Sequence, residues 1–553
     1  MTEQQRINLG VAGMTCDSCA HHVTRALKKV PGVVEVEVPG WQSARAALVA
    51  SAGVPDEALI QAVEAAGYHI AVRERQPMDG GGFQPRGDGR FDLIVVGGGS
   101  AGFAAAIRGV ELGYRVALVN DGTLGGTCVN VGCVPSKTLI RSAEAWHRAG
   151  QQAFDGVTTR QVALDWDMVR RQKDDLVAEL RQSKYADVLA AYPDITFIQG
   201  RARFQEGGSV VVGDRAIRAH KYVITTGAQP RMLPIPGAAE AGVLNSTTLM
   251  DLPKLPKSLI VLGGRAVALE LGQTMARLGV QVIVLQRSPR LIPEHEPEIS
   301  RALKEYLEEE GVGVVTGVQV ERIEKDGDER VVSVRVQGRP HVYRAEQMLM
   351  ALGRHPNTGG MGFDLMGVEL DHNGAIVVDS QMRTSNPSIY ASGDCTINPD
   401  FVYVAAAGGA IAAENALTGA GRALDLSAMP GVIFTDPQVA TVGLTEEQAR
   451  AQGYDTKTSV LPMKHVPRAL AARDTRGLIK LVADGGSDRL LGAHILAPEA
   501  GEMVQTVVLA VRLGVTLQEL RETLFPYLTN VEGLKLAALS FEKDVAMLSC
   551  CAG

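Results

Sequence analysis

The sequence predicts an α/β protein with two parallel-sheet domains, a mixed α+β domain after them and a small βαββαβ domain in front. Composition and length support this class. The 553 residues include 61 glycines and only 5% aromatic residues, which suits tight turns and close packing of helices on strands. This length exceeds what a single core usually supports, so we expect three or four domains.

The small domain is predicted from the apolar pattern of the first 75 residues. The pattern indicates strands at 7–11, 33–38, 46–49 and 70–72 and helices at 18–30 and 55–66. The glycine-rich segment 76–90 follows; it contains two prolines and no apolar periodicity, so we expect a flexible linker there.

The motif GMTCDSC at residues 13–19 lies between the first strand and the first helix of this domain. Unpaired amide groups at a helix start favour thiolates, and the C-x-x-C spacing lets Cys16 and Cys19 hold one ion. The loop resembles that of heavy-metal-associated domains, which implies a ferredoxin-like fold that binds a soft ion such as Cu(I) or Hg(II). A redox pair or half of a zinc site has the same spacing, but the chain has no second C-x-x-C.

The first large domain begins with a buried strand at 91–96 and the glycine fingerprint GGGSAG. Gly97 makes the turn, Gly99 lets the backbone approach a pyrophosphate, and Gly102 permits close helix packing. The following strand ends at Asn120, where an acidic residue usually meets the adenosine ribose. The fingerprint therefore predicts a Rossmann-like domain that binds a dinucleotide.

A second motif identifies this dinucleotide as a flavin. The run SIYASGD at 388–394 resembles the distal flavin motif, in which Asp394 would hold the ribityl chain. Together with the fingerprint it predicts bound FAD. We also expect flavin contacts from Gly126, Thr127 and Gly227.

A degraded fingerprint, GGRAVALE at residues 263–270, predicts the second Rossmann-like domain. Gly263 is retained, whereas the later glycines are replaced. Arg287 and Arg290 follow the next strand, where a protein selective for NAD would carry an acidic residue. Because arginines suit a 2′-phosphate, we predict NADPH as the hydride donor; the alternative is solvated surface charge.

The segment LGGTCVNVGCVPSK at 124–137 contains a second pair of cysteines. Cys128 and Cys133, at a helix start, can close a disulfide or bind a metal as a dithiol, and Lys137 lies one turn further on. The segment resembles the active site of the pyridine nucleotide-disulfide oxidoreductases, and the similarity extends over residues 91–545. It implies that Cys128 exchanges with substrate, that Cys133 contacts FAD, and that Lys137 pairs with Glu270.

Two features near the C-terminus separate this chain from the disulfide reductases of that family. Those enzymes carry H-P-T-x-x-E, whereas this chain has YLTNVE, with Tyr527 and Glu532 in register. A phenol with a pKa near 10 is a poor proton relay at neutral pH, which disfavours a disulfide substrate. The adjacent Cys550 and Cys551 bridge each other only with strain and are better suited to hold a soft ion.

These features together closely resemble the mercuric reductases. The resemblance implies NADPH-dependent reduction of Hg(II) to Hg(0), with the ion passed from Cys16 and Cys19 through Cys550 and Cys551 to the pair beside FAD. It also implies a homodimer, in which the tail, Tyr527 and Glu532 of one subunit serve the redox pair of the other. The expected division is a heavy-metal-associated domain (1–75), a linker (76–90), a FAD-binding domain in two parts (91–235 and 356–428), a NADPH-binding domain (236–355) and a dimerisation domain with the Cys-Cys tail (429–553).

Charge and hydropathy limit the partners. A net charge of −7 without a basic tract argues against nucleic acid, and no run of eighteen apolar residues indicates membrane insertion. We expect a cytoplasmic protein that receives Hg(II) as small thiol complexes, with a membrane mercury transporter as a further candidate donor.

Two other functions remain open at this point. One is a disulfide reductase or dihydrolipoamide dehydrogenase with a fused metal domain, and the other is a metal buffer whose flavin domain keeps the thiols reduced. Metal-dependent oxidation of NADPH far beyond stoichiometry would distinguish an enzyme from a buffer.

Overall fold

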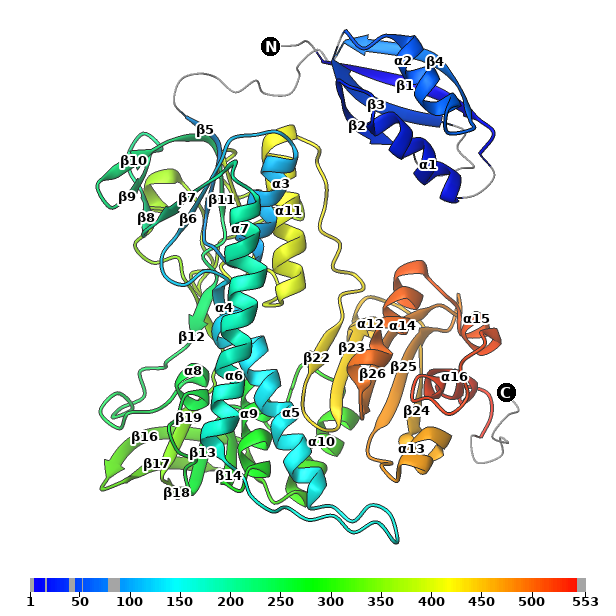
Figure 1. The fold of residues 1–553 in the computed structure, drawn as a ribbon. Coiled ribbons are helices and arrows are strands. Elements are labelled where there is room, and N and C mark those ends of the chain that lie inside the picture. The colour runs from blue at the N-terminus through cyan, green and yellow to red at the C-terminus, as the bar shows by residue number, and fades with distance from the viewer. Residues whose placement is uncertain (1–3, 15–16, 39–44, 52, 78–89, 545–553) are drawn as a thin grey trace. The chain divides into compact units, whose positions relative to one another are not determined.

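The computed structural model describes residues 4–14, 17–38, 45–51, 53–77 and 90–544. The chain separates into two units, Met1–Gly87 and Asp88–Gly553 (Figure 1). Cys16, Cys550 and Cys551 lie outside the described residues.

The first unit has the predicted βαββαβ order: β1 (Gln4–Ala12), α1 (Asp17–Lys28), β2 (Val33–Glu37), β3 (Arg45–Ser51), α2 (Asp56–Glu64) and β4 (His69–Pro77). Its antiparallel sheet has the order β2-β3-β1-β4, and both helices pack with it around one apolar core. The strand β4 is longer than predicted. Gln76 and Pro77, the first residues of the expected linker, pair with β1, because β1 itself begins at Gln4 and offers partners there. The rest of that linker, residues 78–89, is not described.

The second unit begins with a five-stranded parallel sheet of order β21-β11-β5-β6-β7. Its strands are β5 (Phe91–Val96), β6 (Val116–Asn120), β7 (Ile195–Gln199), β11 (Ala219–Ile224) and β21 (Ile389–Ala391). The edge strand β21 comes from a distant part of the chain, as expected for a domain built from two segments. Helices α3 (Ser100–Glu111) and α11 (Val402–Thr418) lie side by side against this sheet (Figure 1). A small antiparallel sheet, β8 (Ala202–Phe204), β9 (Val210–Val212) and β10 (Arg215–Ile217), shares a core with it.

Four helical segments connect β6 to β7 and include the cysteine pair. They are α4 (Gly126–Val131), α5 (Cys133–Ala149), α6 (Trp166–Arg181) and α7 (Asp187–Ala191), with a π-helical turn at Gln182–Ala186 between the last two. Figure 1 shows α5 and α6 as long helices that run from the first sheet toward the second.

The second sheet is also parallel, with the order β15-β14-β13-β19. Its strands are β13 (Ser258–Leu262), β14 (Gln281–Gln286), β15 (Gly313–Thr316) and β19 (Gln347–Met350), and its helices are α8 (Ser246–Met250), α9 (Ala266–Arg277) and α10 (Pro297–Glu309). An antiparallel sheet of β16 (Val318–Asp326), β17 (Glu329–Val336) and β18 (Arg339–Ala345) adjoins it. The short ladder of β12 (Ala228–Pro230) and β20 (Arg354–Pro356) joins this domain to the first.

The last domain is a five-stranded antiparallel sheet of order β22-β23-β26-β25-β24. Its strands are β22 (Gly431–Ile433), β23 (Gln438–Gly443), β24 (Thr456–Pro462), β25 (Leu478–Asp484) and β26 (Leu490–Ala497). Its helices are α12 (Glu446–Ala451), α13 (Pro467–Ala472), α14 (Ala500–Leu513), α15 (Leu517–Glu522) and α16 (Glu532–Leu539). The last helix, α16, ends at Leu539, and the hydroxyl of the next residue, Ser540, donates to the carbonyl of Ala537.

Within the described part of the chain, no helix combines the length and the apolar character needed to span a membrane.

Candidate active site

The cysteine pair lies at two successive helix starts. Cys128 is in the first turn of α4, and Cys133 is the first residue of α5. A hydrogen bond from the Cys128 thiol is the main reason that the pKa of Cys133 falls from 9.0 to about 7, and the charge of Lys137 acts in the same direction. The same hydrogen bond, together with burial, raises the pKa of Cys128 far above its ordinary value. Near neutral pH about half of Cys133 is therefore thiolate beside the protonated thiol of Cys128, and such a pair is suited to bind a soft ion.

Lys137 and Glu270 form the pair that the family resemblance implies. Lys137 Nζ donates to Glu270 Oε2 at 2.6 Å, and this carboxylate is 6% exposed. The second oxygen, Oε1, accepts a hydrogen bond of 2.9 Å from the backbone N–H of Phe434. Since these three residues belong to the first, second and third domains of the unit, all three domains meet beside the cysteines.

Tyr185 also lies near the cysteine pair, and the sequence analysis did not identify it. Its hydroxyl is 3.2 Å from that of Ser100 at the start of α3, and its ring packs edge-on against Phe103. Burial raises the pKa of Tyr185, and its electrostatic interaction with the cysteine pair adds to this effect. The residue lies in the π-helical turn, a distortion often found at functional sites, but no short-range sequence pattern indicated it.

The first glycine turn fits the phosphates of a dinucleotide. A Cβ atom at Gly97, where φ is +118°, would lie 2.3 Å from the carbonyl oxygen of Thr225, and one at Gly102 would lie 1.8 Å from that of Gly97. A Cβ atom at Gly99, in contrast, would meet only the Cα atom of Gly126, at 3.6 Å, so a ligand can approach the backbone of Gly99. Because no side chain caps the start of α3, its N–H groups can receive an anion.

Asn120 has a structural role at this site. Its Oδ1 accepts a hydrogen bond of 2.8 Å from the N–H of Gly98, and its Nδ2 donates to the carbonyl of Gly122. The side chain is buried and braces the glycine turn, so it is already committed within the protein. This explains how an amide can replace the usual acidic residue without disrupting the turn.

Asp394 and Thr127 meet through one arginine. Arg354 Nε lies 3.4 Å from Asp394 Oδ2, and its Nη2 donates to Thr127 Oγ1 at 3.3 Å. Burial raises the pKa of Asp394, and Arg354 opposes that rise. Gly227 has a φ of +66° and accepts a hydrogen bond from Asn357. Gly126 and Gly99, both predicted to contact the flavin, lie close together: a Cβ atom at Gly126 would be 2.8 Å from the Cα atom of Gly99.

The second glycine turn forms despite its degraded sequence. Gly263 has a φ of +121°, and a Cβ atom there would lie 2.4 Å from the carbonyl oxygen of Ala351. Ala268, which replaces a glycine, is fully buried. A Cβ atom built at Gly263 would lie 3.5 Å from the Cβ atom of Ala268, which is an ordinary contact distance. Since no side chain caps the start of α9, this helix can also receive a phosphate.

The two arginines after β14 have different environments. Arg287 is exposed, and its guanidinium makes no hydrogen bond or ion pair with the described residues. Arg290 is half-buried and donates to the carbonyls of Pro293 and His295, at 3.1 Å for the latter. One nitrogen of Arg290, Nη2, is therefore engaged within its own loop, whereas no nitrogen of the Arg287 guanidinium is engaged by the described residues.

The metal-binding residues of the first unit are only partly described. Cys19 lies in the first turn of α1, where the sequence analysis placed it, and Cys16 is not described. Tyr68 approaches the same region, because a Cβ atom at Gly13 would lie 3.9 Å from its ring. Its hydroxyl is 3.4 Å from Nδ1 of His22.

Tyr527 and Glu532 are not brought to the cysteine pair of their own chain. Both belong to the end of the last domain, and Figure 1 shows α16, which starts at Glu532, well separated from α4. Tyr527 is 51% exposed. Glu532 Oε2 is shielded from solvent and accepts no hydrogen bond from the described residues. Any action of these two side chains on a cysteine pair must therefore cross to another subunit.

Comparison with known proteins gives consistent matches over the whole chain. Residues 91–409 match the pyridine nucleotide-disulphide oxidoreductases, residues 429–538 match the dimerisation domain of that family, and residues 9–69 match the heavy-metal-associated domain. The mercuric reductase of Lysinibacillus sphaericus is 42% identical over 99% of this chain and 100% of its own length. Those of Staphylococcus aureus and Shigella flexneri are 43% and 44% identical, over 100% and 99% of this chain and 100% of their own lengths.

Solved structures agree with this assignment. The HOCl-induced flavoprotein disulfide reductase RclA from Escherichia coli is 30% identical, with a TM-score of 0.73 over 81% of this chain and 99% of its own. Its Cu(II) complex is 31% identical, with a TM-score of 0.72 over 80% of this chain and 98% of its own. The chain thus belongs to the pyridine nucleotide-disulphide oxidoreductases and, within them, to the mercuric reductases.

Proposed function

We propose that this chain is an FAD enzyme that uses NADPH to reduce Hg(II) to Hg(0). The observation that carries the proposal is the cysteine pair, Cys128 and Cys133, at two successive helix starts beside Lys137 and Glu270, in a chain with two glycine turns that each suit a dinucleotide. The overall reaction is Hg(II) + NADPH → Hg(0) + NADP⁺ + H⁺, in which the metal gains two electrons and the nicotinamide loses a hydride.

The cysteine pair would hold the metal while it is reduced. Hg(II) is soft and prefers two sulfur ligands, which Cys128 and Cys133 supply once the remaining thiol proton is lost. Release of so tightly held an ion by simple dissociation is slow, so exchange between thiolates must move it. We assign the collection of Hg(II) to Cys16 and Cys19, and its delivery to the pair of tail cysteines, Cys550 and Cys551, of the partner subunit.

The cofactors follow from the two turns. Members of the family use a flavin and a nicotinamide cofactor, and we assign them as FAD and NADPH. FAD, when bound, supplies a two-electron carrier between the nicotinamide and the metal. Gly97, Gly99 and Gly102 would receive its pyrophosphate, with Asp394 on the ribityl chain. Arg287, exposed beside the second turn, is the residue we assign to the 2′-phosphate of NADPH.

The dimerisation domain supports a homodimer. The position of Tyr527 suggests to us that each active site uses residues of both subunits. Since Tyr527 and Glu532 are far from the cysteine pair of their own chain, we assign both to the active site of the partner subunit. A phenol in place of a histidine provides no proton relay near neutral pH, and Hg(II) reduction needs none for a leaving thiol.

Turnover by the purified full-length protein tests the proposal. NADPH oxidation is followed with Hg(II) in excess small thiol, and again with oxidised glutathione and with lipoamide, while Hg(0) is trapped from the gas stream. We expect one Hg(0) for each NADPH and little oxidation with either disulfide. Cys128→Ala and Cys133→Ala should retain the flavin spectrum but lose Hg(II) reduction. Faster reduction of glutathione disulfide than of Hg(II) would identify a disulfide reductase, and saturable binding without NADPH oxidation would identify a metal buffer.

A further inference from the structure

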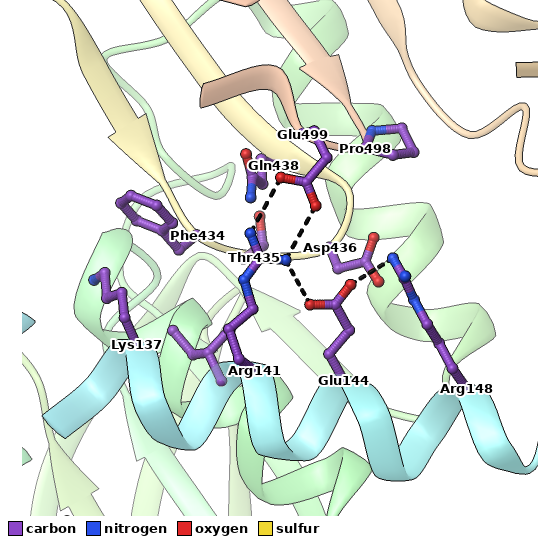
Figure 2. Close-up of a pocket in the computed structure, with 11 residues that line it drawn as sticks. Lys137, Arg141, Glu144, Arg148, Phe434, Thr435, Asp436, Gln438, Pro498 and Glu499 are labelled. Atoms are coloured by element: carbon purple, nitrogen blue, oxygen red, sulfur yellow. Dashed lines mark hydrogen bonds and ion pairs between the residues drawn. The ribbon is translucent and has the colours of Figure 1, made fainter. Parts of the chain in front are cut away.

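A short segment of the dimerisation domain, residues 434–436, lies between α5 and α9. Phe434 follows β22, and Lys137 Nζ lies 4.6 Å from the centre of its ring. Figure 2 shows this ring beside Lys137, at the end of a row of α5 side chains that face the dimerisation domain. The backbone N–H of the same residue donates to Glu270 Oε1. One residue therefore contacts both members of the Lys137–Glu270 pair.

The helix α9 holds this segment along one face. Besides Glu270, Gln273 exchanges two hydrogen bonds of 2.8 Å with the backbone N–H and carbonyl of Asp436. Arg277 Nη1 donates to the carboxylate of Asp436 at 2.9 Å. These α9 residues are three and four positions apart, so they share a face of the helix. The segment is thus fixed at several points, and Phe434 has little freedom to move away from Lys137.

The other charges near Lys137 do not compete for Glu270. The guanidinium of Arg141, one turn further along α5, donates hydrogen bonds to the carboxylates of Glu144 and Glu499, as the dashed lines in Figure 2 show. Both oxygens of Glu270 are occupied, one by Lys137 and one by Phe434. A lysine side chain loses rotamer freedom when it is fixed in place, which costs free energy. The ring face and the carboxylate together offset that cost.

We propose that Phe434 is a positioning residue, whose ring and backbone N–H hold Lys137 and Glu270 in place at the redox centre, so that the dimerisation domain helps to build the active site of its own subunit. The role of the pair in the reaction rests on the proposed function, whereas the positioning itself needs no metal.

The first test measures how well Lys137 is held. Holoenzyme is treated with an amine-acetylating reagent, and mass spectrometry follows the modification rate at Lys137. In Phe434→Leu the ring face is lost but the backbone N–H remains, so we expect Lys137 to react about 2- to 10-fold faster, the range of a lost cation–π contact. Phe434→Met, of similar volume, is a second variant without a ring. Phe434→Tyr keeps the ring and should match the wild type.

A matched control comes from the same domain. Lys457 Nζ lies 5.8 Å from the ring of Phe541, so Phe541→Leu also removes a lysine–ring contact, but away from the cysteine pair. This variant should leave the modification rate of Lys137 unchanged. Unchanged reactivity in both Phe434→Leu and Phe434→Met, or equal acceleration in Phe434→Tyr, would overturn the proposal.

The second test connects the position of Lys137 to the chemistry. Reduction of the bound flavin by NADPH is followed by stopped flow without any metal. Phe434→Leu should slow the limiting rate about 2- to 10-fold with little change in the NADPH concentration that half-saturates it, and Phe434→Tyr should restore the rate. An unchanged limiting rate would overturn the assignment. If wild-type protein fails to oxidise NADPH with Hg(II), the proposed function is wrong, but the acetylation result at Lys137 still decides the positioning.

Discussion

The hydrogen bond between the two cysteines makes a quantitative prediction for Cys128→Ala. This bond is the largest cause of the low pKa of Cys133, about 7 in place of 9.0. With a pKa of about 7, roughly three quarters of Cys133 is thiolate at pH 7.5, whereas with the ordinary pKa only about 3% is. Because the alanine variant cannot donate, the pKa of Cys133 should rise toward 9.0 and its alkylation at pH 7.5 should slow by up to about 25-fold.

The assay is the rate of iodoacetamide alkylation of the reduced protein across pH, measured by mass spectrometry on the peptide that contains Cys133. Lys137 remains in the variant and keeps part of the effect, so the full change of about 25-fold is an upper limit. Cys128→Ser is the matched control: its hydroxyl still donates, and the pKa should stay below 9.0. If Cys128→Ala keeps a pKa of about 7 at Cys133, the hydrogen bond is not the cause and Lys137 must be.

Three further predictions concern the other parts of the chain. Removal of residues 1–87 should leave flavin binding and turnover with Hg(II) in excess thiol within about twofold, because the apolar cores of the second unit contain no residue of the first; loss of the flavin spectrum would contradict this. Arg287→Glu should shift the ratio of kcat/KM for NADPH and NADH by about tenfold or more, and Arg290→Glu by much less; equal shifts would contradict the separate environments of the two arginines. Cys550→Ala with Cys551→Ala should slow turnover strongly for bulky dithiol complexes of Hg(II) and much less for small complexes, and equal slowing for both would rule out a delivery role for the tail.

The two glycine turns could be predicted because their signal is local. A buried strand, a glycine with positive φ and a helix start are all encoded within about ten residues. The degraded fingerprint forms the same turn as the intact one. The helix α9 begins three residues after Gly263, as α3 begins three residues after Gly97. The turn requires its first glycine, whereas the packing around Ala268 tolerates one methyl group.

What sequence reasoning missed depends on tertiary contacts. Tyr185 lies in a π-helical turn that interrupts the helical segment, and its hydroxyl contacts that of Ser100 at the distant start of α3. Arg290 turns toward carbonyls that only the folded loop presents. Element boundaries differed for a similar reason: β4 continues to Pro77 because β1 is long enough to pair with it, a fact about the partner strand and not about the residues of β4.

The arrangement that we propose would separate two tasks between subunits. The groups that would move electrons, the cysteine pair, Lys137, Glu270 and both glycine turns, come together within one chain from three of its domains. Tyr527 and Glu532 lie at the far end of the dimerisation domain, and the described part of the chain does not bring them to that pair. Since the tail cysteines follow closely in the sequence after α16, the same subunit boundary would divide delivery of the metal from its reduction. A monomer would then keep its electron path but lose the delivery of Hg(II) from bulky complexes, which gives the dimerisation domain a part in function as well as in assembly.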